Sequence, residues 1–183
     1  MRQGVQTPTL EDHPFFTDGV TWSAIGHYVE EGGRVLPAVG TYRLRQATAG
    51  DARLTGAILP SDPDDDLPEA PARWRLDVDL RLVLVGGDHT AWQAVMLIDD
   101  PDNGGRDAFW SWHSLTMGDL TGHFSAVGDS FLNQAFSEDG SYGLTECFLL
   151  AEEDEAYLVR GAVARDGQTI GAWALELTLA EES

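Results

Sequence analysis

The densest group of side chains that could do chemistry lies at residues 109–113, which read Phe-Trp-Ser-Trp-His. On a β-strand Trp110 and Trp112 would share one face, and Phe109, Ser111 and His113 the other. If the second face points into the protein, His113 is a polar group in an apolar cavity, suited to orient a ligand or to move a proton. The alternative is a hydrogen-bonded or surface histidine, because the sequence pairs His113 with no particular carboxylate.

His27 is a second acid/base candidate, and together with His113 and His123 it invites comparison with a three-histidine metal site. The spacing of these residues follows no zinc-ligand signature. The acidic stretch at residues 99–107 also fails the EF-hand order, since position five counted from Asp100 is Gly104 and not an acidic residue. We therefore predict no metal site.

Six tryptophans are numerous for 183 residues, and they could line a cavity for a flat or apolar ligand. Packing within a filled core is the alternative for each of them. Of these, Trp22, Trp92 and Trp110 are predicted to contact a ligand, together with Tyr42 and His113.

Arginines on the second and third predicted strands could hold a ligand carboxylate, because a guanidinium grips a carboxylate with two hydrogen bonds. Arg43 is the predicted anchor, with Arg45 and Arg75 as further candidates. The alternative is a solvated outer face, since alternation places Arg43 and Arg45 opposite Tyr42 and Leu44.

The elements that must position these residues are short runs of alternating apolar and polar residues. Ten runs read as strands, at residues 20–30, 37–47, 73–85, 90–98, 107–115, 119–126, 130–137, 142–151, 156–165 and 169–179, and residues 53–59 could add a short one. Connections this short force antiparallel neighbours, and closure of such a sheet removes its edges. We predict an all-β fold, a single antiparallel up-and-down barrel of about 8–10 strands.

Two segments fall outside these strands. Residues 1–18 are predicted to form a loose N-terminal arm in which Phe15 and Phe16 could plug the body, and residues 19–183 to form one barrel domain. Residues 60–71 read as an acidic, proline-rich loop.

Composition narrows the function classes. The net charge of -20, with no lysine, repels phosphate backbones and anionic membrane surfaces, so we predict neither a nucleic-acid nor a membrane partner. The single Cys147 allows no internal disulfide. The N-terminus has no apolar signal-peptide region and no apolar run is long enough to span a bilayer, so a cytoplasmic location is expected.

The first strand carries a family resemblance. Trp22 stands near its start, followed by Gly26, His27 and Tyr28, with Gly40 and Tyr42 on the second strand. This arrangement resembles the opening of calycin-type barrels, the group of lipocalins, fatty-acid-binding proteins, nitrobindin-like haem barrels and phycobiliprotein lyases. The resemblance implies a lipocalin-like barrel whose floor is closed by Trp22 and whose cavity holds a small, mainly apolar molecule. No histidine follows His123, where nitrobindin-like barrels take their haem ligand, so no cofactor is predicted.

Three hypotheses follow from the sequence. The first is binding of a small hydrophobic molecule in the barrel interior. The second is an isomerase or lyase that uses His113 or His27 as acid/base in the same cavity. The third is a non-catalytic interaction module with a filled barrel and an acidic surface. A homodimer is compatible with either binding hypothesis.

Overall fold

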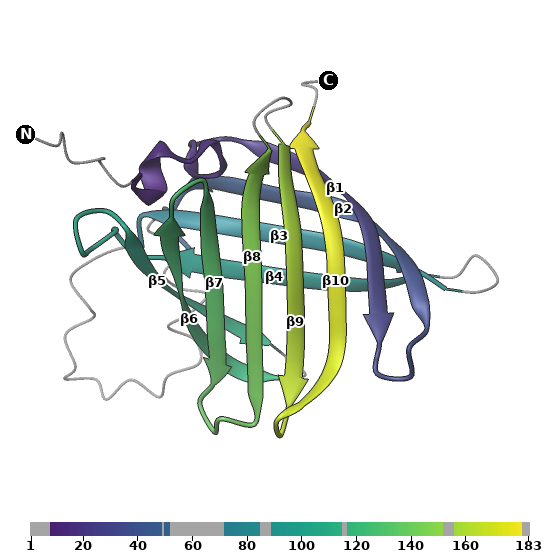
Figure 1. Ribbon diagram of the computed structural model, residues 1–183. Helices are drawn as coiled ribbons and strands as arrows, with labels where there is room; N and C mark the ends of the chain where they lie inside the picture. Colours follow the sequence, from purple (N-terminus) through teal and green to yellow (C-terminus); the bar gives the residue numbers. More distant parts are fainter. Residues whose placement is uncertain are drawn as a thin grey trace, which may run out of the picture.

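The computed structural model describes residues 8–48, 50–51, 72–84, 89–114, 117–151 and 156–180. Within them, ten antiparallel strands close into one barrel, in which each strand pairs with its neighbours in sequence and β1 pairs with β10 (Figure 1). The strands are β1 (Thr21–Glu30), β2 (Val35–Gln46), β3 (Trp74–Val83), β4 (His89–Ile98), β5 (Asp107–Ser114), β6 (Gly118–Val127), β7 (Ser130–Ser137), β8 (Tyr142–Ala151), β9 (Ala156–Arg165) and β10 (Gln168–Leu179). The predicted all-β up-and-down barrel is thus confirmed.

Period-two alternation sorts each strand into an inner and an outer face, because successive side chains point to opposite sides of a strand. On β3, Trp74, Leu76 and Val78 are buried inside, whereas Arg75 and Asp77 between them lie outside. The largest differences from the predicted boundaries are two residues. The strand β3 ends at Val83 and not at residue 85, and β2 begins at Val35 and not at residue 37. The tight turn after Glu30 brings Val35 into register with Val29, so pairing starts before Pro37. The predicted short strand at residues 53–59 and the loop at 60–71 lie outside the described residues.

One end of the barrel is plugged by the segment before β1. Two short 3-10 helices, η1 (Leu10–Asp12) and η2 (Pro14–Phe16), lie across this end (Figure 1). Phe15 is fully buried, and its ring contacts those of Trp22, Tyr42, Phe131, Phe148 and Tyr157. In the described part of the predicted loose arm, apolar burial therefore fixes the chain against the barrel, and Phe15 and Phe16 fill its interior.

The wall of the barrel is least complete between β4 and β5. Among the described residues the register between these two strands contains only Leu97↔Ser111 and Ile98↔Trp110, both near the plugged end. Farther along, the wall is bridged by side chains, with the rings of Trp92 and Trp112 in edge-to-face contact at 5.6 Å between centroids. The end of the barrel opposite the plug is therefore held more loosely than the plugged end.

Among the helices in the described part of the chain, none has the length and apolar character needed to cross a membrane.

Candidate ligand-binding site

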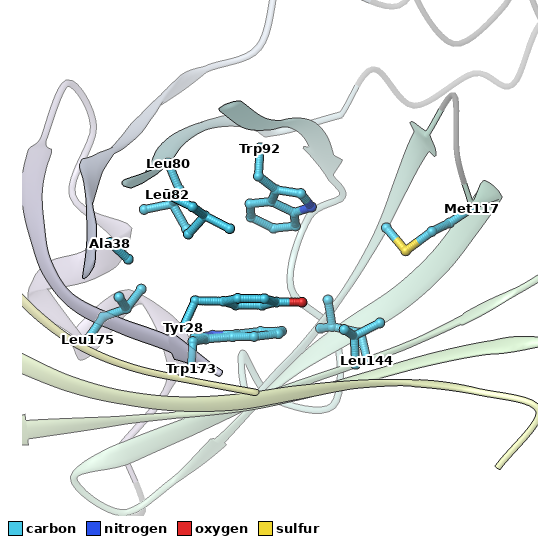
Figure 2. Close-up of a pocket in the computed structure, with 10 residues that line it drawn as sticks. Tyr28, Ala38, Leu80, Leu82, Trp92, Met117, Leu144, Trp173 and Leu175 are labelled. Carbon is cyan, nitrogen blue, oxygen red and sulfur yellow. The ribbon is translucent and has the colours of Figure 1, made fainter. Parts of the chain in front are cut away.

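A cavity of about 110 Å³ lies inside the barrel at the end opposite the plug (Figure 2). All of its lining residues are apolar or aromatic, and they come from strands all around the barrel together with the β5–β6 turn. They are Tyr28, Ala38, Leu80, Leu82, Trp92, Met117, Leu144, Val163, Trp173 and Leu175. A dry cavity of roughly 150 Å³ accepts a benzene molecule, so this one has room for about a single small ring.

Three aromatic rings dominate the walls, and we call Tyr28, Trp92 and Trp173 the aromatic slot. Tyr28 and Trp173 lie nearly parallel, 6.4 Å apart with 14° between their planes, and Trp92 extends from the opposite side (Figure 2). The Trp92 and Trp173 rings are also 6.4 Å apart, inclined at 39°. A flat or compact group entering the cavity would therefore meet aromatic faces on two sides.

Behind the slot lies a buried carboxyl group. Glu146 on β8 is only 3% exposed, and its Oε1 accepts a hydrogen bond from the Trp173 indole Nε1 at 3.0 Å. Its Oε2 accepts one from Asn133 Nδ2 at 2.7 Å. The Asn133 Oδ1 in turn accepts one from Trp110 Nε1 at 2.8 Å. Both polar side chains thus have hydrogen-bond partners inside an apolar core, as most buried polar groups do.

Strand register places these groups in a single transverse row. Asn133 is opposite Glu146, Glu146 opposite Gly161, Gly161 opposite Trp173, and Trp173 opposite Tyr28. A Cβ on Gly161 would lie 2.3–2.5 Å from three atoms of the Trp173 indole. The missing side chain on β9 is therefore what lets the indole of β10 reach across to Glu146 on β8.

The same device supports Trp110. This indole lies over Gly122 on β6, where a Cβ would be 2.5–2.6 Å from the ring, and so reaches Asn133 on β7. Two glycines thus act as platforms that allow indole N–H groups to cross an intervening strand.

Burial disfavours the charged form of Glu146 and raises its pKa to about 7, although the bonds from Asn133 and Trp173 act in the opposite direction. The group next to the cavity therefore titrates near neutral pH. Its charge also contributes to a raised pKa of the buried Tyr42, for which desolvation is the main cause.

Of the six residues predicted to contact a ligand, Trp92 alone lines the cavity. Trp22 and Tyr42 are buried at the plugged end, and Trp110 is buried in the hydrogen-bonded row. Within the described residues the Trp22 Nε1 and the Tyr42 hydroxyl have no hydrogen-bond partner. These three aromatic residues therefore build the interior without reaching the cavity.

Arg43 and His113 lie on the outer surface. The face of β5 that carries Phe109, Ser111 and His113 points outward, because Trp110 and Trp112 fill the inside. There the His113 Nδ1 lies 2.5 Å from a carboxylate oxygen of Asp119. His27 is likewise exposed on the outer face of β1. Neither His113 nor His27 therefore points into the cavity, where the hypothesis of a histidine acid/base would need it.

The further arginine candidates are engaged elsewhere. Arg45 and Arg75 both form ion pairs with Asp51, at 2.9 Å and 2.6 Å, on the outside of the barrel. This outward placement is the alternative to a carboxylate anchor that the alternation of polar and apolar residues along the strand predicts.

The prediction from sequence missed Tyr28, Glu146, Asn133 and the role of Trp173. A signal for Glu146 is nonetheless present, since it occupies an inward position between the apolar Leu144 and Phe148. Asn133 stands in the same way between Phe131 and Ala135. A polar residue that interrupts the apolar face of a strand marks an interior site.

No family model and no curated protein matches this chain. Comparison with solved structures finds the S-type phycobiliprotein lyase CPES from Guillardia theta, with a TM-score of 0.62 over 96% of this chain and 94% of that chain. The fold is calycin-like. At 12% sequence identity the likeness concerns this calycin-like fold alone.

Proposed function

We propose that this calycin-like barrel binds a small, mainly apolar molecule, or the apolar end of a larger one. The proposed site is the cavity at the end of the barrel opposite the plug, which we call the open end. The observation that supports this proposal is a cavity walled by apolar and aromatic side chains, beside a densely packed core of buried residues in the described part of the barrel. A ligand that covers this apolar surface excludes water from it, and this burial stabilises the complex by about 25 cal/mol for each Å² of apolar surface.

The size of the cavity narrows the proposal. Its volume of about 110 Å³ is below the ~300 Å³ at which pockets for drug-sized ligands begin. One ring or a short branched group fits without rearrangement. A larger ligand would insert one end and leave the remainder at the mouth, where the β4–β5 wall has few ladder bonds.

The structural likeness to a phycobiliprotein lyase supports a barrel that handles a small molecule, because the two chains share one fold over most of their length. Catalysis by a histidine is not part of the proposal, because none of the described residues that line the cavity is a histidine.

Titration with the neutral fluorophore N-phenyl-1-naphthylamine tests the proposal, with tryptophan quenching as a second readout. The blocking variant is Leu82→Trp, which adds an indole at a lining position. The matched control is Val83→Trp, one residue further along β3 on the outer face. We expect Leu82→Trp to weaken binding by about tenfold or more, or roughly 1.4 kcal/mol, and Val83→Trp to bind like the wild type.

Equal binding by the two variants would place the fluorophore elsewhere and refute a site in this cavity. Circular dichroism of each variant checks that the barrel is folded. Native mass spectrometry of the protein purified from its own host then searches for the natural ligand.

A further inference from the structure

The aromatic slot presents ring faces to the cavity from both sides. Tyr28 lies on one side, stacked on Trp173, and Trp92 lies on the other (Figure 2). The face of an aromatic ring is the negative pole of its quadrupole, and it attracts a cation within about 6 Å of the ring centre. Aromatic walls therefore favour a positively charged group over a neutral group of equal shape.

The hydrogen bond behind the slot strengthens this preference. The Trp173 indole donates its N–H to Glu146, and donation to a carboxylate polarises the donor and leaves its ring richer in electrons. The Glu146 carboxyl, when ionised, also adds a negative charge at the edge of the ring, next to the indole N–H.

No cationic side chain in the lining would compensate a negative charge. The ten lining residues include no arginine or histidine, and the chain has no lysine. Arg45 and Arg75 are bound to Asp51 outside the barrel, and Arg43 is exposed on the outer face. A ligand carboxylate entering the cavity would lose its hydration and meet only the neutral donors of Tyr28 and Trp92, with no cationic partner.

The rim of the open end is negatively charged, like the ring faces of the aromatic slot. The described residues of its hairpin turns and their flanking positions include five carboxylates: Glu30, Glu31, Glu138, Asp139 and Asp166. The two arginines of this set, Arg34 and Arg165, already pair with Glu30 and Asp166. Bonds from Ser137 and Ser141 lower the pKa of Asp139 to about 2, so it stays ionised. A negative rim raises the local concentration of cations.

Resting on the proposed function, we infer that the group taken into the aromatic slot is an organic cation, such as a quaternary ammonium or a delocalised aromatic cation, and that the pocket discriminates against carboxylates and other anions. This deepens the proposed function by assigning a charge to the ligand.

Three probes of similar shape and different charge test the inference. Benzyltrimethylammonium is a cation, neopentylbenzene is its neutral carbon isostere, and benzylsulfonate is an anion. Binding is followed through the indole N–H signals of ¹⁵N-labelled protein, at both low and high salt. We expect the cation to bind about tenfold more tightly than the neutral probe, and the anion to bind more weakly than either.

The variant Trp92→Leu removes one aromatic face and keeps the wall apolar. Its expected effect is to reduce the cation's advantage several-fold while the neutral probe still binds. Val83→Trp serves as the unaffected control. A preference that persists at high salt in the wild type and falls in Trp92→Leu belongs to the slot and not to the rim, because salt screens exposed charges most strongly.

Two results would overturn the inference, and they differ in what they leave standing. If the neutral probe binds as tightly as the cation, the charge assignment is wrong and the proposed binding site survives. If none of the three probes shifts the Trp92 or Trp173 signal in the folded protein, both proposals fail.

Discussion

Trp173 lies flat across Gly161, its partner in the β9–β10 ladder, and this contact lets the indole nitrogen reach Glu146 one strand further on. One face of the ring lines the cavity while its N–H holds a buried carboxyl. The cavity wall and the polar row inside the barrel are thereby joined through a single side chain.

A Gly161→Ala substitution tests this relationship. The new methyl group would overlap the indole of Trp173, which must move and give up its bond to Glu146. Overpacking of this kind costs about 1–3 kcal/mol of unfolding free energy, measurable by urea denaturation. Movement of Trp173 should also change tryptophan fluorescence and weaken probe binding.

The matched control is Gly32→Ala, in the β1–β2 turn, where a Cβ would meet no atom within 4 Å. Equal stability of the Gly161→Ala and wild-type proteins would show that the indole is not confined by Gly161.

The raised pKa of Glu146 predicts a pH dependence of stability. The ordinary pKa of 4.5 applies to the unfolded chain, and a value of about 7 to the folded one. Below about pH 4.5 both states hold the proton. Between the two values the unfolded state releases it and the folded state keeps it, so stability falls as pH rises, by about 1.4 kcal/mol for each pH unit. The total cost is on the order of 3 kcal/mol and is constant above pH 7.

Urea denaturation at several pH values, for the wild type and for Glu146→Gln, measures this dependence. The unfolding free energy of the wild type minus that of Glu146→Gln should fall with pH by the amount given above, since the amide does not ionise. His13, whose pKa burial lowers, changes stability in the opposite direction but is common to both proteins. Parallel pH profiles for the two proteins would contradict the assignment.

On the outside of the barrel, Asp51 joins β2 to β3 by accepting bonds from both Arg45 and Arg75. These bonds hold the pKa of Asp51 well below its usual range, chiefly through Arg45, so its stabilising effect is present above about pH 4 and is lost in acid. We expect Asp51→Asn to reduce the unfolding free energy by about 1–3 kcal/mol, between the values for exposed and buried pairs.

Thermal unfolding at pH 7 provides the measurement, with Asp77→Asn as the control. Asp77 pairs with Arg75 at a more exposed position and should contribute less. Ligand binding should be unchanged in both variants, because this ion-pair group is outside the barrel. A loss of probe binding in Asp51→Asn would show that it supports the cavity.

Local pattern was sufficient to predict the barrel. Alternation in each strand and short turns between strands allow few arrangements other than an antiparallel sheet, and ten such strands remove their edges by closing. The burial of Phe15 and Phe16 was equally accessible, because two adjacent phenylalanines before the first strand need an apolar surface to cover them.

The make-up of the candidate site, in contrast, depends on the tertiary structure. Alternation says that Trp110 and His113 face opposite ways, but which of them faces inward depends on how the sheet curls. In the same way, Asn133, Glu146, Gly161 and Trp173 come from four strands, and only the cross-strand register of the closed barrel sets them in one row. Local pattern along the chain thus specifies the strands and the two faces of each strand. Which face becomes the interior, and which residues meet there, is set by the closure of the sheet.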